Sequence, residues 1–371
     1  MNIVRPVFSG MGEKKISLFN IHPVKTGVTQ VSLLYRKALT ELGFKVDWKQ
    51  CTVGEPVARY IEPTVFGINI WPKKFSKLVN LLFFVPRMTK FTNNDLIILS
   101  DPWLLGLTRY HKNTVLIFHD NRNSTKYRDD VFSSILFRFF LKEIRLAKFV
   151  IAVSEFSERI LLELGIPQER IFLLYNSSEL ISDMSLKQIQ PHQLKKIFSV
   201  YYVASNQRHK NINFYLSIAK SFLDSAWANN IHFYLLTNNL KNMCCPDLNN
   251  VTIVTKNIDL NEFYMKMDCL VFPSLYEGFG LPLIEAMSYG IPIIASDIPT
   301  NNEIIGDSGL IVGDFETLTW KRAIESLLNP TNYDKYSALS YNRSKMFSYD
   351  NFKKRLNSII GKMLQEGHSF E

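Results

Sequence analysis

Residues 268–297, DCLVFPSLYEGFGLPLIEAMSYGIPIIASD, contain the pattern that decides the fold. An apolar run at 269–272 precedes a glycine loop that holds Glu277, and the helical segment that follows contains Glu285. A second apolar run, at 291–295, comes next. A strand, a glycine loop, a helix start and another strand bring backbone N–H groups and two carboxylates to one helix N-terminus. We expect such a place to bind a polyhydroxylated, phosphorylated ligand.

The length and composition of the chain predict two soluble domains. With 371 residues, of which 46% are hydrophobic, the chain is long enough for two packed cores. The longest strongly apolar run, at 78–85, is far shorter than the roughly 20 residues of a membrane-spanning helix, and the N-terminus lacks the apolar core of a signal peptide. We therefore expect a cytoplasmic protein. The four cysteines lack metal-binding spacing and are expected to be reduced thiols.

Basic residues are concentrated in the first half of the chain. Residues 1–175 contain 25 Lys and Arg against 15 Asp and Glu, a net charge of +10, whereas residues 176–371 contain 18 against 19, a net charge of −1. This asymmetry predicts that one domain meets an anionic membrane surface or a nucleic acid, with a generic solvated basic surface as the alternative. Segment 73–90 mixes apolar and basic residues and fits either peripheral binding at the inner face of the cell membrane or a core helix with solvent-reaching lysines.

Apolar runs alternate with helical periodicity through both halves of the chain. In the first half these runs lie at 16–21, 44–48, 96–99, 115–118, 149–153 and 171–175. In the second half they lie at 198–204, 232–236, 251–254, 270–272, 292–295 and 310–312. This alternation predicts an α/β protein with a doubly wound parallel sheet in each half. The chain closes with helices expected near 316–328 and 350–365.

Periodicity is lost around Pro191, and this loss marks the expected domain boundary. We place an interdomain linker at 181–196, between an N-terminal domain at 1–180 and a C-terminal domain at 197–349.

Several polar residues follow predicted strands. Thr26 and Gly27 precede the first helical pattern, and His119 directly follows an apolar run. Parallel sheets bind ligands at the carboxyl ends of their strands, so His119 is a candidate ligand contact, with a structural histidine as an equal alternative. Arg208 and Lys210 follow the first strand of the second half and can balance the negative charge of a diphosphate. The chain has no Asp-x-Asp triplet, the usual magnesium-binding signature, so we expect these two residues to bind the diphosphate without a metal. A solvated basic turn is the alternative.

These residues resemble the motifs of a known family. Glu277 and Glu285, eight positions apart in EGFGLPLIE, resemble the E-x7-E signature of the family-4 retaining glycosyltransferases (glycosyl transferases group 1) of the GT-B fold. Other matching segments occur in the expected order, at 26–28, 119–120, 153–157, 208–211 and 302–309. The resemblance implies two Rossmann-like domains facing across a cleft, with the C-terminal helix at 350–371 packed back on the first domain. The donor would bind in the second domain and the acceptor in the first.

The resemblance also implies roles for individual residues of the second domain. Glu285 would accept hydrogen bonds from both ribose hydroxyls of a nucleotide; the alternative is an acidic residue favoured by the helix dipole. Glu277 would hold the hydroxyls of the donor sugar. The backbone of the neighbouring donor-site residues would assist it; these are Gly278, Phe279, Gly280 and Leu281. Lys210 and Arg208 would stabilise the departing diphosphate.

The first domain supplies the other implied contacts. His119 would contact the sugar near its reacting carbon, and Thr26 and Gly27 would complete the donor site. The first loop of the family usually has two adjacent glycines, and Thr26 replaces the first of them. In the family an arginine often lies six positions before the lysine that corresponds to Lys210, and this chain has Ala204 there. Residues 176–177 are Asn-Ser in place of the common Asn-Gly.

The implied enzyme is a metal-independent, retaining hexosyltransferase. It needs no cofactor besides the nucleotide-diphosphate sugar as co-substrate, and its acceptor would be a glycan, a lipid-linked glycan or another hydroxyl compound. A glycosidase also uses two carboxylates, but Glu285 bound to ribose cannot act as acid or nucleophile. Two alternatives stay open: a non-catalytic sugar-nucleotide-binding or scaffold protein of the same fold and, with less support, a basic nucleic-acid-binding protein, for which no aromatic-basic motif is present.

Overall fold

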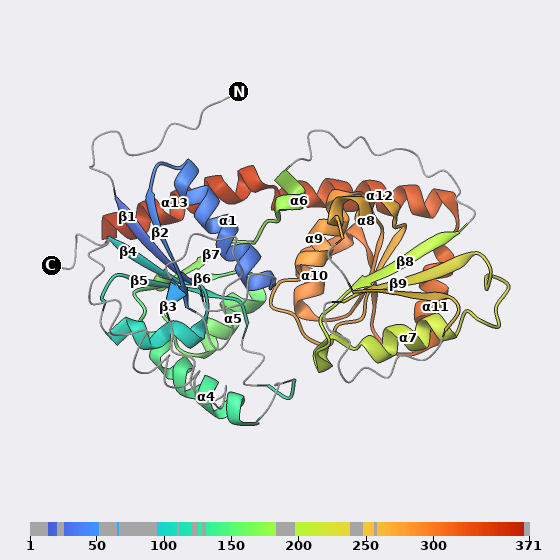
Figure 1. Ribbon diagram of the computed structural model, residues 1–371, viewed down its shortest axis with the longest axis horizontal. Coiled ribbons are helices and arrows are strands. Elements are labelled where there is room, and N and C mark those ends of the chain that lie inside the picture. Colours follow the sequence, from blue (N-terminus) through green and yellow to red (C-terminus); the bar gives the residue numbers. More distant parts are fainter. Residues whose placement is uncertain are drawn as a thin grey trace. The chain divides into compact units, whose positions relative to one another are not determined.

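The chain folds as two compact units in the computed structural model. The structure describes residues 14–20, 26–51, 65–66, 95–109, 111–120, 125–127, 131–182, 197–237, 248–255 and 258–366. One unit comprises Met1–Ser177 with Asp350–Glu371, and the other comprises Ser178–Tyr349 (Figure 1). The predicted amphipathic segment 73–90 and residues 183–196 of the predicted linker lie outside the described residues.

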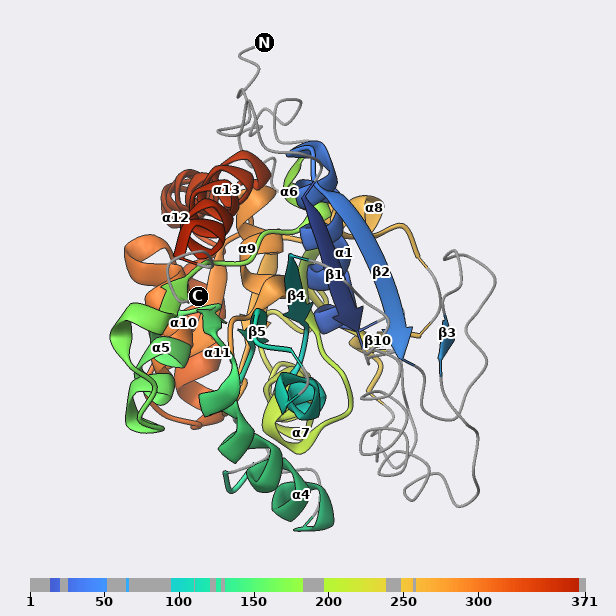
Figure 2. The same cartoon turned by 90° about the vertical axis from the view of Figure 1, so that its left-hand side faces the viewer.

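The first unit contains a seven-stranded parallel sheet in the order β3-β2-β1-β4-β5-β6-β7. Its strands are β1 (Lys15–Asn20), β2 (Lys45–Cys51), β3 (Val65–Phe66), β4 (Leu96–Leu99), β5 (Thr114–Phe118), β6 (Phe149–Ala152) and β7 (Ile171–Leu173). Strands β1, β2 and β4 run side by side, with β1 in the middle (Figure 2). The strand order therefore reverses between β1 and β4, which is where open α/β sheets bind ligands at the carboxyl ends of their strands.

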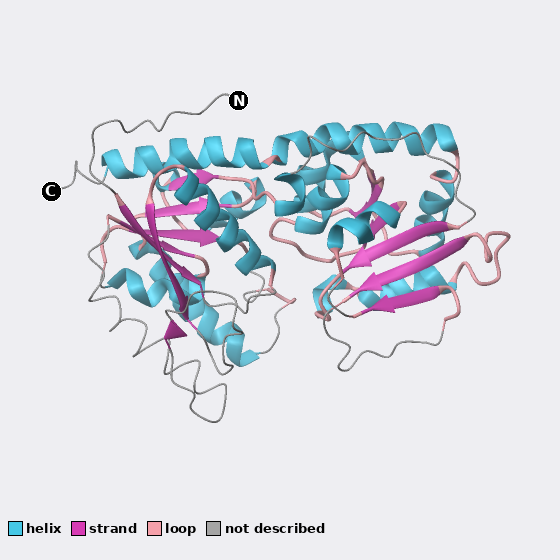
Figure 3. Cartoon of the chain, turned by 45° about the horizontal axis from the view of Figure 1, so that its top comes forward, coloured by secondary structure: helices cyan, strands magenta, loops and turns pink. Residues whose placement is uncertain are grey.

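Helices cover both faces of this sheet (Figure 3). They are α1 (Gly27–Glu41), α4 (Val131–Lys142), α5 (Glu155–Glu163) and α13 (Tyr349–Glu366), with 3-10 segments η2 (Pro102–Arg109), η4 (Glu143–Leu146) and η5 (Gln168–Arg170). Strands β4, β5 and β6 are buried along their whole length, as expected for parallel strands covered on both faces. Helix α13 packs on α1 through an edge-on contact of Phe352 with Tyr35. Within the described ranges, no helix is long and apolar enough to cross a bilayer.

The second unit contains a six-stranded parallel sheet in the order β10-β9-β8-β11-β12-β13. Its strands are β8 (Phe198–Val203), β9 (Ile231–Leu236), β10 (Val251–Val254), β11 (Cys269–Phe272), β12 (Ile293–Ser296) and β13 (Leu310–Val312). The order reverses between β8 and β11, which pair in parallel with Cys269 opposite Val200. These two sheets confirm the predicted fold class of two doubly wound, Rossmann-like α/β domains.

The second unit also contains the helices that support its sheet. They are α6 (Glu179–Ser182), α7 (Ile212–Lys220), α8 (Leu260–Lys266), α9 (Leu281–Ser288), α10 (Pro299–Ile305), α11 (Thr317–Ser326) and α12 (Pro330–Ser344), with 3-10 segments η7 (Arg208–Lys210), η8 (Gly306–Ser308) and η9 (Lys345–Phe347). Helix α12 was not predicted from the sequence. Its buried residues are Tyr333 and three serines, Ser337, Ser340 and Ser344, so they form no apolar period along the sequence. It packs against α9, and the hydroxyl of Ser340 donates to the carbonyl of Ile291 at 2.9 Å.

Candidate active site

Lys210 lies at the reversal point of the second sheet. It ends the η7 turn that follows β8, and Asn211 then adopts a left-handed conformation (φ 52°, ψ 40°) before α7 begins. Asparagine enters this conformation at lower cost than most residues, so the chain can change direction directly after the lysine. The carbonyl of Lys210 accepts a hydrogen bond from the hydroxyl of Tyr202 at 2.7 Å. The lysine main chain is thereby attached to β8.

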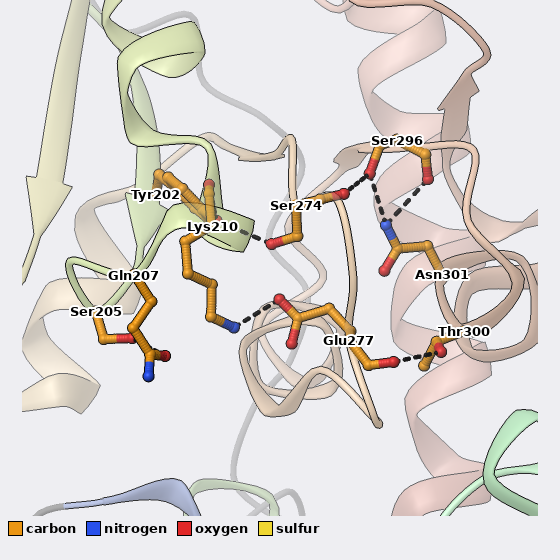
Figure 4. A network of polar contacts seen from close by, with 9 residues as sticks. All are labelled: Tyr202, Ser205, Gln207, Lys210, Ser274, Glu277, Ser296, Thr300 and Asn301. Carbon is orange, nitrogen blue, oxygen red and sulfur yellow. Dashed lines mark hydrogen bonds and ion pairs between the residues drawn. The ribbon is translucent and has the colours of Figure 1, made fainter. Parts of the chain in front are cut away.

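Glu277 approaches Lys210 from the loop that follows β11. The ammonium nitrogen of Lys210 lies 2.6 Å from Oε1 of Glu277, and the two side chains point toward one another (Figure 4). The carboxylate side chain is only 8% exposed and the lysine side chain 16% exposed. One cation and one carboxylate are therefore held, largely out of water, where a parallel sheet is expected to bind a ligand.

The glycine loop between Glu277 and α9 is buried. Gly280 has φ 94° at the start of α9, a backbone conformation that is strained for residues with a side chain, and a Cβ there would lie 2.9 Å from Cδ1 of Leu283 and displace that side chain. The ring of Phe279 packs edge-on against Phe347 at 5.9 Å between centroids. Phe279 can therefore serve a ligand only through its backbone, and Leu281 is the half-buried first residue of the helix. The sugar-holding role of this loop stays a prediction.

Glu285 is buried in α9 and is already hydrogen-bonded through both carboxylate oxygens. The hydroxyl of Ser178 donates to Oε1 at 2.8 Å, and the hydroxyl of Tyr264 donates to Oε2 at 2.7 Å. No acidic residue lies in the first turn of α9, so Glu285 is not explained by the helix dipole. Sequence reasoning did not find Ser178 and Tyr264, because each lies far along the chain from Glu285 and no local pattern signals the contact.

Burial gives Glu285 a measurable pH signature. Burial raises the pKa of the Glu285 carboxyl above its ordinary value, and the hydrogen bonds from Tyr264 and Ser178 offset only part of the rise. The folded protein therefore binds this proton more tightly than the unfolded chain, and this group lowers the free energy of unfolding as the pH rises from the ordinary to the raised pKa.

We expect Glu285→Gln, which removes this titration, to gain stability relative to wild type as the pH rises through that window. Melting temperatures of both proteins measured between about pH 4 and about pH 8 check this result, since the ordinary glutamate pKa is about 4.3. A difference in melting temperature that does not change with pH would contradict it.

Three predicted site residues belong to the first unit. Thr26 caps α1: its Oγ1 accepts a hydrogen bond from the backbone N–H of Thr29 at 3.3 Å, and Gly27 is the first residue of the helix. His119 follows β5, is half-buried, and its carbonyl accepts a hydrogen bond from the hydroxyl of Ser157 at 3.3 Å. The side chain of Thr26 thus has a structural role, and the donor contacts predicted for Thr26, Gly27 and His119 stay predictions.

A buried polar network that sequence reasoning did not find lies beside Thr26. Asn20, at the end of β1, donates to Oγ1 of Thr29 at 3.0 Å and accepts from the hydroxyl of Ser100 at 3.0 Å. Ser100 directly follows β4, so this network spans the reversal point of the first sheet.

Arg208 differs from Lys210 in its surroundings. Its side chain is exposed, and in the part of the chain that the structure describes no ion pair involves it. The structure therefore brings Lys210, and not Arg208, to Glu277. The diphosphate role of Arg208 stays a prediction.

Two Rossmann-like units with these topologies form the architecture of the GT-B glycosyltransferases. The sucrose-phosphate synthase of Thermosynechococcus elongatus matches with a TM-score of 0.73 at 18% identity, over 95% of this chain and 100% of that chain. An Anabaena protein solved in complex with UDP-glucose matches with a TM-score of 0.69 at 14% identity, over 94% of this chain and 99% of that chain. These likenesses establish the GT-B fold.

Sequence comparisons identify the family. The model "Glycosyltransferase Family 4" matches residues 26–178, and the model "Glycosyl transferases group 1" matches residues 198–330. The chain belongs to the family-4 glycosyltransferases, as the E-x7-E motif led us to expect. It is also similar to the O-antigen chain mannosyltransferase of Salmonella typhimurium, with 26% identity over 377 residues, 95% of this chain and 99% of that protein.

Proposed function

We propose that this glycosyltransferase moves mannose, a hexose, from a nucleotide-diphosphate sugar to a growing glycan or lipid-linked glycan, with retention of the anomeric configuration and without a metal. The Lys210–Glu277 ion pair at the reversal point of the second sheet is the observation that carries this proposal. The similarity to a mannosyltransferase along the whole chain supports the choice of sugar. It also favours an enzyme over a non-catalytic or nucleic-acid-binding protein.

Lys210, Glu277 and Glu285 are proposed to bind different parts of the donor. Lys210 supplies the positive charge that a departing diphosphate needs. Glu277, whose Oε1 is 2.6 Å from the lysine nitrogen, accepts hydrogen bonds from the sugar hydroxyls next to that diphosphate. Glu285 accepts from the ribose hydroxyls, because a carboxylate has about four acceptor sites and only two are taken by Ser178 and Tyr264.

The proposed transfer takes place on one face of the sugar. The bond from the anomeric carbon to the diphosphate oxygen breaks, and an oxocarbenium-like state forms. The acceptor hydroxyl adds to the same face, and its proton passes to the departing phosphate oxygen. The reaction then needs no protein base, and Glu277 is free to hold the sugar through its hydroxyls.

The acceptor is proposed to reach the first unit at a membrane surface. The net charge of +10 over residues 1–175 supports contact with anionic lipid at the inner face of the cell membrane. The Salmonella relative is named for an O-antigen chain, which supports a glycan acceptor.

The proposal is tested with purified protein and a panel of sugar nucleotides that includes GDP-mannose and UDP-glucose. We expect one nucleotide-mannose to raise the melting temperature and to release nucleoside diphosphate at the same rate with and without EDTA. Nuclear magnetic resonance of the transferred sugar should show the anomeric configuration of the donor. A product of opposite configuration would contradict retention, loss of rate in EDTA would contradict metal independence, and absence of binding to every sugar nucleotide would contradict the whole proposal.

A further inference from the structure

The main chain on both sides of the Lys210–Glu277 ion pair is held by buried hydroxyl groups to which the proposed chemistry gives no role. Tyr202, in β8, is fully buried, and its hydroxyl donates to the carbonyl of Lys210 at 2.7 Å. The same hydroxyl lies 2.9 Å from Oγ of Ser274, which follows β11 (Figure 4). One phenol therefore links the lysine turn to the start of the glutamate loop.

Thr300 holds the other side of the pair. It lies in α10, is 1% exposed, and its Oγ1 donates to the carbonyl of Glu277 at 2.8 Å. Its neighbour Asn301 donates through Nδ2 to the carbonyl of Ser296 at 3.0 Å, and the hydroxyl of Ser296 donates to the carbonyl of Ser274. The glutamate loop is thus attached to the end of β12 as well as to β8.

A backbone hydrogen bond joins the two loops directly. The N–H of Leu275 donates to the carbonyl of His209 at 2.7 Å, one residue before Lys210. With Tyr202 and Thr300, this bond fixes the spacing between the lysine and glutamate main chains. Neither hydroxyl bonds to the ion-pair side chains themselves, so any effect on them passes through the main chain.

We propose that Tyr202 and Thr300 are positioning residues of the donor site. The hydroxyl of Tyr202 sets the position from which Lys210 meets the diphosphate, and the hydroxyl of Thr300 sets the position from which Glu277 meets the donor sugar. This inference rests on the proposed function of the two charged residues.

The physical reason is the precision that the charged contacts require. Lys210 and Glu277 meet at 2.6 Å, and a misplacement of about 1 Å at such a contact costs roughly 100-fold in rate. Burial and the negative charge of Glu277 raise the pKa of Tyr202 well above its ordinary value, so the phenol remains a hydrogen-bond donor throughout the neutral range. If its hydroxyl partner were removed, the carbonyl of Lys210 or of Glu277 would be left without that hydrogen bond, and we expect the loop to shift so that the carbonyl finds another donor.

The two positions predict separable defects when each hydroxyl is removed. Tyr202→Phe is expected to weaken binding of GDP or UDP by about 3- to 10-fold, and to lower kcat for donor hydrolysis by about 10- to 100-fold. Thr300→Val is expected to leave the Kd for GDP and UDP within about 2-fold of wild type, because these nucleotides lack the transferred sugar that Glu277 is proposed to hold. The same variant is expected to lower kcat by about 10- to 100-fold. Thr300→Ser keeps the hydroxyl and is expected to restore kcat to within about 3-fold of wild type.

Two matched variants separate positioning from a general loss of stability. Tyr215→Phe removes another buried phenol of the same unit, whose hydroxyl donates to the carbonyls of Val200 and Tyr234. Thr108→Val removes a buried hydroxyl that donates to the carbonyl of Leu105 in the first unit. Both are expected to lower the melting temperature by amounts similar to the test variants, with kcat at the wild-type value.

The closing experiment measures kcat, the Kd for GDP and UDP, and the melting temperature of all five variants and of Lys210→Ala. Wild-type kcat in Thr300→Val or Tyr202→Phe, with Lys210→Ala inactive, would overturn the positioning roles and leave the proposed function intact. Equal losses of kcat in the matched variants, or no rescue by Thr300→Ser, would also overturn them. Wild-type kcat in Lys210→Ala would instead overturn the proposed function.

Discussion

Replacing Glu285 with glutamine is expected to remove most of the affinity for nucleotides while the protein stays folded. The carboxylate accepts hydrogen bonds from the hydroxyls of Ser178 and Tyr264 and is proposed to accept two more from the ribose hydroxyls. A hydrogen bond to a charged group contributes about 1.5–3 kcal/mol, so the loss of charge should raise the Kd for GDP and UDP by about 10- to 100-fold or more. Isothermal titration calorimetry with both nucleotides measures this change.

Glutamine is a better probe than alanine because of the buried contacts of Glu285. Alanine would leave the hydroxyls of Ser178 and Tyr264 without their acceptor, at a cost of roughly 1–3 kcal/mol for the buried Tyr264 hydroxyl. Reduced binding would then be confused with partial unfolding. Glu262→Gln, on an exposed glutamate of α8, is the matched control and should leave nucleotide affinity unchanged. Wild-type affinity of Glu285→Gln for every nucleotide tested would exclude the residue from the site.

The fold could be predicted because its signals are local. Short apolar runs separated by helical periodicity indicate parallel strands, and the predicted run at 96–99 is β4 itself. Helix α12 was not predicted because three of its four buried residues are serines. Its start nevertheless has a local signal, since the side chain of Asn329 accepts hydrogen bonds from the N–H groups of Thr331 and Asn332, and Pro330 is the first residue of the helix. Caps therefore identify a helix that an apolar period cannot.

The candidate site could be predicted only in part because its contacts are not local. The motif singles out Glu277 and Glu285, and the basic turn singles out Lys210. The sequence, however, makes Arg208 and Lys210 look equivalent, and only the turn of η7 leaves one exposed and points the other at Glu277. Tyr202 and Thr300 act through main-chain carbonyls of residues distant in the chain, and such pairing depends on the packed sheet rather than on any pattern along it.

Lys210→Met is expected to lower turnover of the sugar nucleotide by roughly 100- to 1,000-fold, the range seen when one preorganised group that stabilises developing charge is removed. The structure also predicts a loss of stability. The side chain of Glu277 is only 8% exposed, and Lys210→Met removes the cation that pairs with its carboxylate. We expect a decrease of roughly 1–3 kcal/mol in the free energy of unfolding, less than the about 3–5 kcal/mol of a fully buried pair because the lysine side chain is partly exposed.

A double variant separates these two effects of Lys210. Lys210→Met combined with Glu277→Gln removes both charges, so the stability should return toward wild type while turnover stays low. Lys266→Met, which breaks the exposed pair with Glu262, should change the stability by less than about 1 kcal/mol and leave turnover unchanged. Urea unfolding and donor hydrolysis measured on all four proteins test both expectations. If turnover recovered with stability in the double variant, Lys210 would act only by neutralising Glu277. Because Glu277 is itself proposed to hold the donor sugar, low turnover in a restabilised protein shows that the loss of turnover does not follow from the loss of stability.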